Sequence, residues 1–320
     1  MLFERVWIVN SGNQSTITNR HSVDRLHGII PPMVTPFNRE GDLDEEAFLA
    51  NLERYTGIGL AGVMVAGTTG EAPFLTAAER LQLTEVARRS VKRDELVITG
   101  TGLESTRETI LLSREAAARG ADILLVVTPG YYKSKMDGPA LLAHYRAVAD
   151  AVPRPVLIYS IPQCTGVQIP VKTLVSLSRH PNIAGLKESS GDLTYMRTVL
   201  RSVRPGFRVF SGSLKILPDV LRAGGAGGIV GQADFAPELC VAFYEAFRQN
   251  RRKLAGELFA RLLPLATGIN LKYGAPAVKA AMDIAGFRGG EPRSPLLPVN
   301  ARARREITRT LKTAKSGLAL

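Results

Sequence analysis

The stretch Asn182-Ile183-Ala184-Gly185-Leu186-Lys187-Glu188-Ser189-Ser190 decides both the fold and the chemistry expected of this chain. A short apolar run ends in a lysine and small polar residues follow, which is typical of a buried strand that delivers one ionisable group to the open end of a barrel. Burial disfavours the charged form of a lysine and lowers its pKa. A neutral Lys187 amine could attack a ketone and form a Schiff base. The simpler alternative is a lysine that is solvated or paired with Glu188.

Apolar runs of strand type lie on both sides of this stretch and alternate with segments of helical period. The predicted strands are Gly28–Val34, Ala61–Gly67, Leu96–Gly102, Ala121–Pro129, Pro155–Pro162, Ile183–Ser189, Phe207–Ser213 and Ala226–Gly231. They are continuous rather than alternating, as expected of strands covered on both faces. Eight strand–helix units predict an α/β fold, the (β/α)₈ TIM barrel. A doubly wound open sheet is the alternative, but no G-x-G-x-x-G follows a strand.

Helix start signals stand between the predicted strands. Capping-box patterns occur at Asp42-x-x-Glu45, Thr76-x-x-Glu79 and Ser105-x-x-Glu108, and prolines that suit a helix start occur at Pro170 and Pro237. Beyond the eighth unit, further helices are predicted over Leu254–Ile269, Pro276–Ile284 and Ala301–Lys312. We therefore predict a barrel over residues 28–250 and C-terminal helices over 251–320. Residues 1–27 read as an N-terminal extension, with Ser11–Arg20 disordered or loosely docked.

The composition excludes several classes of protein. A chain of 320 residues with 45% hydrophobic content can bury a large core. Its two cysteines, Cys164 and Cys240, form no disulfide framework and no metal-ligand spacing, which favours a reducing compartment and a cytoplasmic location. The four histidines are scattered, so neither a metal nor a cofactor is expected. No apolar run approaches the roughly 20 residues that span a membrane.

The net charge of +12 is the main argument for another function. Such a charge suits nucleic acid, an anionic membrane or anionic small substrates. A nucleic-acid-binding or regulatory module is the alternative hypothesis, supported by the basic segment Ala301–Lys315. No nucleic-acid motif accompanies it, and the aromatic share is only 6%. We expect no nucleic-acid partner and a solvated basic surface.

The residues at the strand ends suit covalent carbonyl chemistry. In a barrel of this kind, the reacting groups lie at the carboxyl ends of the strands. Lys187 would be the amine, and Tyr159 would pass a proton to and from a substrate oxygen. The glycines and hydroxyls of Gly67-Thr68-Thr69-Gly70 would bind a carboxylate with backbone N–H groups. Glu71 is expected to be structural.

Each of these assignments has a structural alternative. Tyr159 could be a core tyrosine with a satisfied hydroxyl, and Thr68 and Thr69 could form a plain strand-to-helix turn. The glycine-rich Gly224–Gly228 could cradle a phosphate or cofactor near the eighth strand, although such glycines more often allow tight packing.

Three segments together resemble the dihydrodipicolinate synthase/N-acetylneuraminate lyase family: Gly67-Thr68-Thr69-Gly70-Glu71, Tyr159 and Gly185-Leu186-Lys187-Glu188. The similarity extends from about Gly28 to the C-terminal helices. It implies a Schiff-base-forming barrel that acts on pyruvate or another 2-oxo acid together with an aldehyde, usually as a homotetramer.

The resemblance also implies individual roles. Lys187 would be the Schiff-base lysine and Tyr159 the catalytic tyrosine. Thr68 would relay protons between Tyr159 and Tyr131, with Tyr131 supplied by a neighbouring subunit. The predicted substrate contacts are Gly67, Thr68, Thr69, Gly212 and Ile229, the last through its backbone carbonyl.

One departure from the family pattern bears on the substrate. Synthases of this family carry an arginine two residues before the glycine of the fifth-strand motif, where it holds the carboxylate of the aldehyde. This chain has Cys164 there, and a thiol cannot replace a bidentate guanidinium. Stretches such as Glu71-Ala72-Pro73-Phe74-Leu75-Thr76 instead resemble the 4-hydroxy-2-oxoglutarate aldolase branch. We therefore predict an aldolase or lyase of that type, with dihydrodipicolinate synthase or another 2-oxo acid lyase or dehydratase as the alternative.

Overall fold

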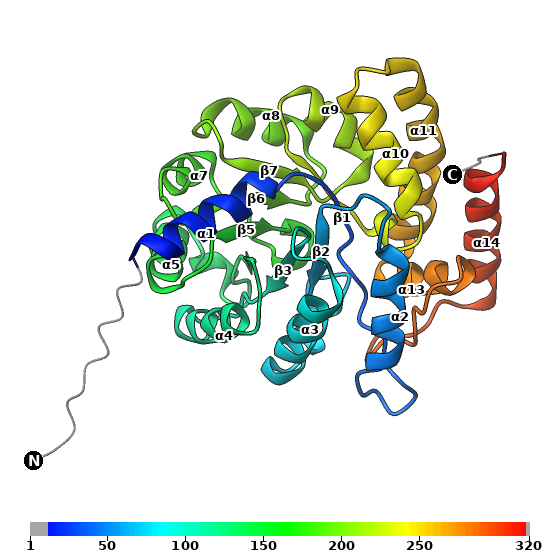
Figure 1. Cartoon of the computed structure of the whole chain (residues 1–320), viewed down its shortest axis with the longest axis horizontal. Helices are drawn as coiled ribbons and strands as arrows, with labels where there is room; N and C mark the ends of the chain where they lie inside the picture. Colours follow the sequence, from blue (N-terminus) through cyan, green and yellow to red (C-terminus); the bar gives the residue numbers. More distant parts are fainter. Residues whose placement is uncertain (1–11, 318–320) are drawn as a thin grey trace, which may run out of the picture.

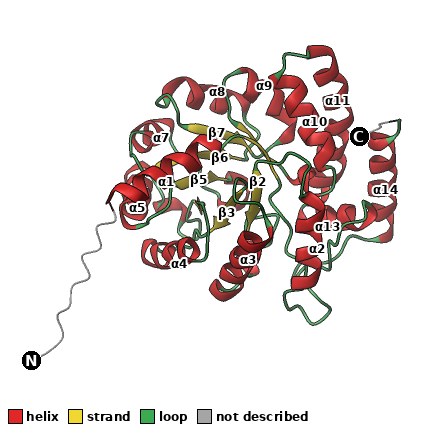
Figure 2. Ribbon diagram, in the orientation of Figure 1, coloured by secondary structure: helices red, strands yellow, loops and turns green. Residues whose placement is uncertain are grey.

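Parallel strands form the centre of the molecule and helices surround them (Figures 1 and 2), over the residues 12–317 that the computed structural model describes. The strands are β1 Gly28–Ile30, β2 Gly62–Val65, β3 Leu96–Gly100, β4 Ile123–Val127, β5 Val156–Ser160, β6 Ile183–Glu188, β7 Arg208–Ser211 and β8 Gly227–Ile229. They pair in the order β1-β8-β7-β6-β5-β4-β3-β2. Backbone bonds from Ala61 to Ile29 and from Met64 to Pro31, both 3.0 Å, link β2 to β1 and complete the ring. The TIM-barrel prediction is confirmed.

The outer layer consists of helices that follow the strands. They are α2 Glu45–Tyr55, α3 Ala77–Ser90, α4 Thr106–Ala118, α5 Gly138–Ala151, the short α6 Pro162–Thr165, α7 Val171–Ser178, α8 Leu193–Ser202, α9 Leu217–Arg222 and α10 Pro237–Arg248. Each strand is buried along almost its whole length because the helices cover one face and the barrel interior covers the other. This explains why the strands read as continuous apolar runs.

Two of the three predicted capping boxes lie at helix starts. Thr76 and Glu79 bond reciprocally at the start of α3, and Ser105 accepts from the backbone of Glu108 at the start of α4. The third prediction was wrong, because Asp44 and not Asp42 caps α2. The backbone N–H of Asp42 donates to the side chain of Asn38, 2.9 Å away, so Asp42 belongs to the preceding turn.

An N-terminal helix, α1 Gly12–Arg25, lies where disorder or loose docking was expected. The side chain of Asn19 bonds Asn182 just before β6, and Arg25 bonds the backbone of Arg93 just before β3. The helix therefore crosses the end of the barrel at which the strands begin, and the fully buried Leu26 fills that end. The sequence hides this helix because its polar residues lack an apolar period. Residues 1–11, including the apolar segment Met1–Val9 and Trp7, lie outside the described part.

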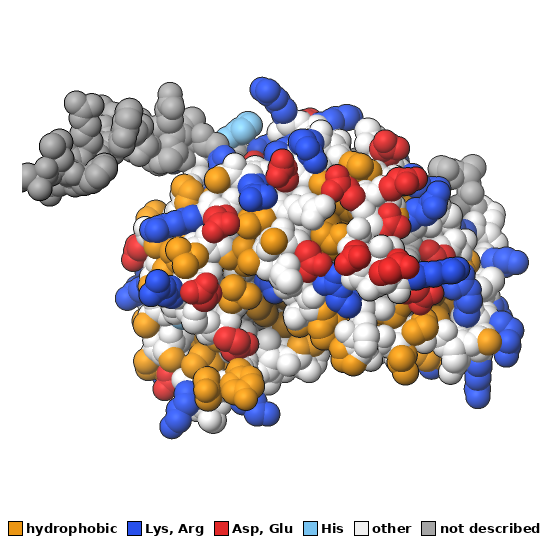
Figure 3. Space-filling model, turned by 90° about the horizontal axis from the view of Figure 1, so that it is seen from below, with side chains coloured by type: hydrophobic (Ala, Val, Ile, Leu, Met, Phe, Trp, Pro, Cys, Tyr) orange, Lys and Arg blue, Asp and Glu red, His pale blue; other side chains and the backbone are white. Residues whose placement is uncertain are grey.

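The C-terminal helices pack beside α10 on one side of the barrel, in yellow to red in Figure 1. They are α11 Arg252–Leu265, the π-helical η5 Ala266–Asn270, α12 Leu271–Tyr273, α13 Ala275–Ile284 and α14 Ala301–Lys315. The predicted C-terminal helical extension is therefore present. None of the helices in the described residues is long and apolar enough to cross a membrane. Acidic and basic side chains are interspersed over the face seen in Figure 3.

Candidate active site

Lys187 lies near the carboxyl end of β6, between Tyr159 on β5 and Phe210 on β7. Its side chain is only 3% exposed. The amine lies 4.2 Å from the centroid of the Tyr159 ring and 3.7 Å from the sulfur of Met64. Glu188 accepts instead from the backbone of Ser190, at 2.9 Å. The alternatives of a solvated lysine or a Lys187–Glu188 pair therefore do not describe this site.

Burial shifts the pKa values of the Lys187 amine and the Tyr159 phenol. Desolvation lowers the pKa of Lys187 to about 7, against the opposing charge of Asp234. A large fraction of this amine is then neutral near pH 7 and can act as a nucleophile. Desolvation also raises the pKa of Tyr159 to about 12, with hydrogen bonds from Thr68 and Ser189 opposing the rise. Tyr159 is therefore a protonated phenol at neutral pH, which can donate a proton.

The loop after β2 brings Thr68 to Tyr159. The two hydroxyl oxygens lie 3.1 Å apart, so each can pass a proton to the other. The loop is fixed against the segment that follows β1, because the Thr35 hydroxyl donates to the Gly70 carbonyl at 2.7 Å. A Cβ on Gly70 would lie 2.7 Å from the carbonyl oxygen of Met33, closer than real Cβ contacts. Glycine is therefore required where the loop meets the segment that follows β1.

A cavity of about 540 Å³ opens beside these groups at the carboxyl end of the barrel. Of the predicted site residues, Gly67, Thr68, Tyr131 and Tyr159 line it. Cys164 also lines the cavity, at the position where the family resemblance implies an arginine in the synthases. The cavity wall does not include Thr69, Gly212, Ile229 or the buried Lys187.

Tyr131 lies at the rim of the cavity and not in its interior. Its side chain is 78% exposed and packs edge to face on Tyr132, with ring centroids 5.0 Å apart. The Glu104 carboxylate accepts from the backbone N–H groups of Gly130 and Tyr131, at 3.1 and 2.9 Å. Glu104 therefore fixes the backbone that carries Tyr131. The relay from Thr68 to Tyr131 stays a prediction.

The other two predicted contacts lie on β8 and just after β7. The Ile229 side chain packs in the barrel interior together with Tyr159 and Met64. The Gly212 N–H donates to the Glu188 carbonyl at 2.7 Å, and a Cβ there would lie 1.8 Å from the Ser189 hydroxyl. The glycine thus leaves room for Ser189 near Tyr159.

Sequence reasoning missed a buried carboxylate in this region. Asp234 ends the 3₁₀ turn η4 Gly231–Asp234 and is fully buried. Burial raises the pKa of Asp234 well above its usual range, with the Val34 amide and Lys187 opposing the rise. A signal was available, because Asp234 follows the eighth strand and so belongs to the strand ends where function is expected.

The glycine-rich segment Gly224–Gly228 joins the end of α9 to β8 and includes the first two residues of that strand. The backbone of Gly225 bonds Val220 at 2.8 Å. A Cβ on Gly227 would lie 1.9 Å from the Gly28 carbonyl oxygen. These glycines allow close packing, which is the simpler of the two interpretations.

A closed parallel barrel with a buried amine and a phenol at its carboxyl end places this chain among the (β/α)₈-barrel enzymes. The model of the Dihydrodipicolinate synthetase family matches residues 25–314. The chain belongs to that family and is a lyase of it.

Two relatives and one solved structure illustrate the similarity. The 4-hydroxy-tetrahydrodipicolinate synthase of Methanopyrus kandleri is 34% identical and covers 90% of this chain and 96% of its own length. The probable mitochondrial 4-hydroxy-2-oxoglutarate aldolase of Emericella nidulans is 38% identical and covers 84% of this chain and 88% of its own length. The solved structure is YagE in complex with pyruvate, an E. coli K12 prophage protein of the dihydrodipicolinic acid synthase family. It is 29% identical to this chain with a TM-score of 0.85, and the match covers 91% of this chain and 99% of YagE.

Proposed function

We propose that this protein is a Schiff-base aldolase in which Lys187 forms an imine with pyruvate, as donor or product. The observation that carries the proposal is the burial of Lys187, which lowers the pKa of the amine to about 7 beside Tyr159. An amine that is partly neutral at physiological pH attacks ketones readily. The solved structure of YagE with pyruvate supports pyruvate as the ligand.

The proposed reaction begins with the carboxylate of the 2-oxo acid. The backbone N–H groups and hydroxyls of Thr68 and Thr69 would bind it, with further contacts from Gly67, Gly212 and the backbone carbonyl of Ile229. The Lys187 amine adds to the ketone carbon, and water leaves as the imine forms. The protonated imine accepts the electron pair released when the bond between C3 and C4 breaks, or supplies that pair as an enamine in the reverse direction.

Proton transfer is assigned to Tyr159. Its phenol donates a proton to the departing hydroxyl during imine formation, and the phenolate left behind takes the proton of the aldol hydroxyl during cleavage. Thr68, 3.1 Å away, would relay that proton toward Tyr131 of a neighbouring subunit. This scheme requires no metal and no cofactor. Because it uses Tyr131 of a neighbouring subunit, we also propose a homotetramer.

For the partner aldehyde, we favour glyoxylate and a 4-hydroxy-2-oxoglutarate aldolase-like reaction. Cys164 lines the cavity at the position where the resemblance implies an arginine in the synthases, and a thiol cannot make the bidentate bonds of a guanidinium, which argues against aspartate semialdehyde. The similarity to the Emericella nidulans aldolase supports this choice. The similarity to the Methanopyrus kandleri synthase supports the alternative, condensation with aspartate semialdehyde, equally well.

Borohydride trapping tests the proposal. The protein is mixed with pyruvate and reduced, and the adduct is located by peptide mass spectrometry. We expect a reduced pyruvate adduct on Lys187 and none in Lys187→Ala. A folded protein that forms no adduct would overturn the proposal. Product analysis with pyruvate plus glyoxylate, and pyruvate plus aspartate semialdehyde, then separates the two activities.

A further inference from the structure

Glu71 is held in an unusual conformation at the end of the loop that carries Thr68 and Thr69. Its φ of 58° lies in the left-handed region, which residues other than glycine seldom adopt. Such a conformation persists when its surroundings hold it in place. The side chain is 1% exposed, and its two carboxylate oxygens face different partners in the C-terminal part of the chain.

One oxygen of Glu71 lies 2.5 Å from the amine of Lys279, on α13, and this ion pair is buried on both sides. The other oxygen accepts from the backbone N–H of Arg293 at 2.8 Å. Lys279 also donates to the carbonyl of Glu291 at 2.7 Å. The segment 289–293, here called the C-terminal strap, is thus tied both to α13 and to the loop.

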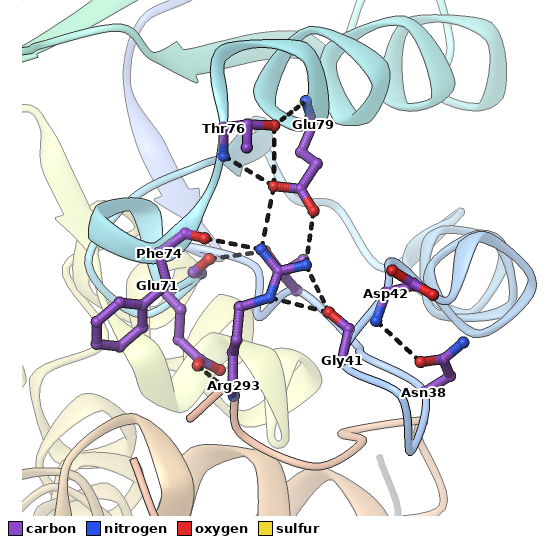
Figure 4. A network of polar contacts seen from close by, with 10 residues as sticks. Asn38, Gly41, Asp42, Glu71, Phe74, Thr76, Glu79 and Arg293 are labelled. Atoms are coloured by element: carbon purple, nitrogen blue, oxygen red, sulfur yellow. Dashed lines mark hydrogen bonds and ion pairs between the residues drawn. The ribbon is translucent and has the colours of Figure 1, made fainter. Parts of the chain in front are cut away.

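The Arg293 side chain fastens the strap to the barrel (Figure 4). Its guanidinium donates to the carbonyl of Gly41 at 2.6 Å and to the carbonyl of Phe74 at 2.7 Å. It also donates to both carboxylate oxygens of Glu79, at 2.6 and 3.0 Å. These bonds hold the pKa of Glu79 below its usual range. The strap therefore joins the β1–α2 loop, the β2–α3 loop and the first turn of α3.

The aromatic ring of Phe37 contacts both cations of this network. The centroid of the Phe37 ring lies 4.4 Å from the Lys279 amine and 4.1 Å from the Arg293 guanidinium. Cation–π contacts of this kind stabilise cations that have been removed from water. A Cβ on Gly289 would lie 2.1 Å from the Lys279 carbonyl oxygen, so the strap lies directly against α13.

The cost of this arrangement indicates more than a role in stability. Burying an ion pair has a large desolvation penalty, and well-packed apolar residues often stabilise a fold as well. Burial lowers the pKa of Lys279, with the Glu71 charge opposing the change. The ion pair does fix the orientation of the Glu71 carboxylate. Since Glu71 is at the end of the loop that carries Thr68 and Thr69, the ion pair also fixes that loop.

We propose that Glu71, held by Lys279 and by the strap amide of Arg293, is a positioning residue that sets the Thr68–Thr69 loop for binding the substrate carboxylate. The inference rests on the proposed function, since it concerns the same carboxylate. It differs from a purely structural role in one respect. Loosening the loop should weaken binding of ketones that carry a carboxylate and leave ketones that lack one unaffected.

The test compares Lys187 trapping by borohydride with two ketones, pyruvate and acetone. The variant is the double substitution Glu71→Gln and Lys279→Met, which removes both charges together and leaves no lone buried ion. We expect the half-saturating pyruvate concentration to rise about tenfold or more, because small misplacements of binding groups are costly. We expect the acetone concentration dependence to change less than twofold. Arg293→Met releases the strap and leaves the ion pair in place. It should raise the half-saturating pyruvate concentration by a smaller factor, again with little change for acetone.

The matched control is Lys272→Met with Glu306→Gln. This C-terminal ion pair, at 2.7 Å, joins α12 to α14 and does not touch Glu71. It should trap both ketones as the unchanged protein does. Equal pyruvate dependence in the Glu71/Lys279 variant and the unchanged protein would overturn the inference alone. An equal loss for both ketones in Arg293→Met would overturn it in favour of general loosening. No adduct with the unchanged protein would overturn the proposed function itself.

Discussion

The amine of Lys187 lies 4.2 Å from the centre of the Tyr159 ring, because the two residues are in register on the neighbouring strands β6 and β5. Strand pairing alone therefore sets the geometry between the proposed nucleophile and the proposed proton donor. Neither position can shift without moving a strand of the barrel.

The pH dependence of imine formation follows from the pKa of Lys187, which burial lowers to about 7. Only the neutral amine attacks, so the rate should rise with pH up to about 7 and level off above it. Below pH 6 the rate should fall about tenfold per pH unit. Stopped-flow measurement of adduct formation with pyruvate checks this. A midpoint near 10 would mean that burial does not control this lysine.

Lys187 should also lower the stability of the folded protein. The folded-state pKa is about 7, below the usual value of 10.5, so the unfolded chain binds more protons between these values and stability rises with pH there. Lys187→Met should therefore stabilise the protein by an amount on the order of 4 kcal/mol at or below pH 7. The gain should shrink as pH approaches 10. Denaturant unfolding at pH 6.5 and pH 10 measures the difference, and a loss of stability at both pH values would contradict it.

Removing the Tyr159 hydroxyl should slow turnover without preventing imine formation at Lys187. Positioned proton transfer contributes about 10²–10⁴-fold, so Tyr159→Phe should lose that much in kcat. Borohydride should still trap pyruvate on Lys187. Tyr145→Phe is the control, because its hydroxyl bonds the Val126 carbonyl away from the cavity. A loss below tenfold would make Tyr159 a packing residue.

Thr68 should act through its hydroxyl, which lies 3.1 Å from the hydroxyl of Tyr159. This bond counteracts the rise in the pKa of Tyr159 caused by burial. Thr68→Val should therefore lower kcat roughly tenfold or more, while Thr68→Ser keeps most of the activity. Steady-state kinetics of the two variants distinguishes a hydroxyl role from a shape role. Equal losses in both would favour shape.

Glu104 should matter because its carboxylate bonds the backbone of Gly130 and Tyr131. Glu104→Ala should free the loop that carries Tyr131 and reduce turnover about tenfold, with pyruvate trapping retained. Glu108→Ala, four residues later on the exposed surface of α4, is the matched control. Turnover equal to that of the control would show that this loop needs no support from Glu104.

Local patterns were sufficient to predict the barrel and the centre of the site. A lysine closing an apolar strand predicts a buried amine at the end of the barrel where parallel strands end together. The pairing of Thr68 with Tyr159 was implied by the family resemblance. The short helix α6, the cap at Asp44 and helix α1 were not predicted, because they depend on turn geometry and on docking that polar sequence does not reveal.

The residues that support the site could not be predicted in this way. Lys279 and Arg293 read as ordinary basic residues of C-terminal segments, and Glu71 as a loop carboxylate. Their contact joins positions more than 200 residues apart, and no local period marks such a pair. Asp234 is a different case. Its place after a predicted strand could be read from the sequence, and only its burial could not.

The bond between Arg293 and Glu71 also has a consequence for how the protein is made. The two residues are 222 positions apart, so at about 5–20 residues per second the ribosome adds Arg293 roughly 10–45 seconds after Glu71. Throughout that time the loop after β2 exists without its anchor. A nascent chain that has completed all eight strands still lacks the strap, so the loop gains its anchor only after the whole barrel has been synthesised.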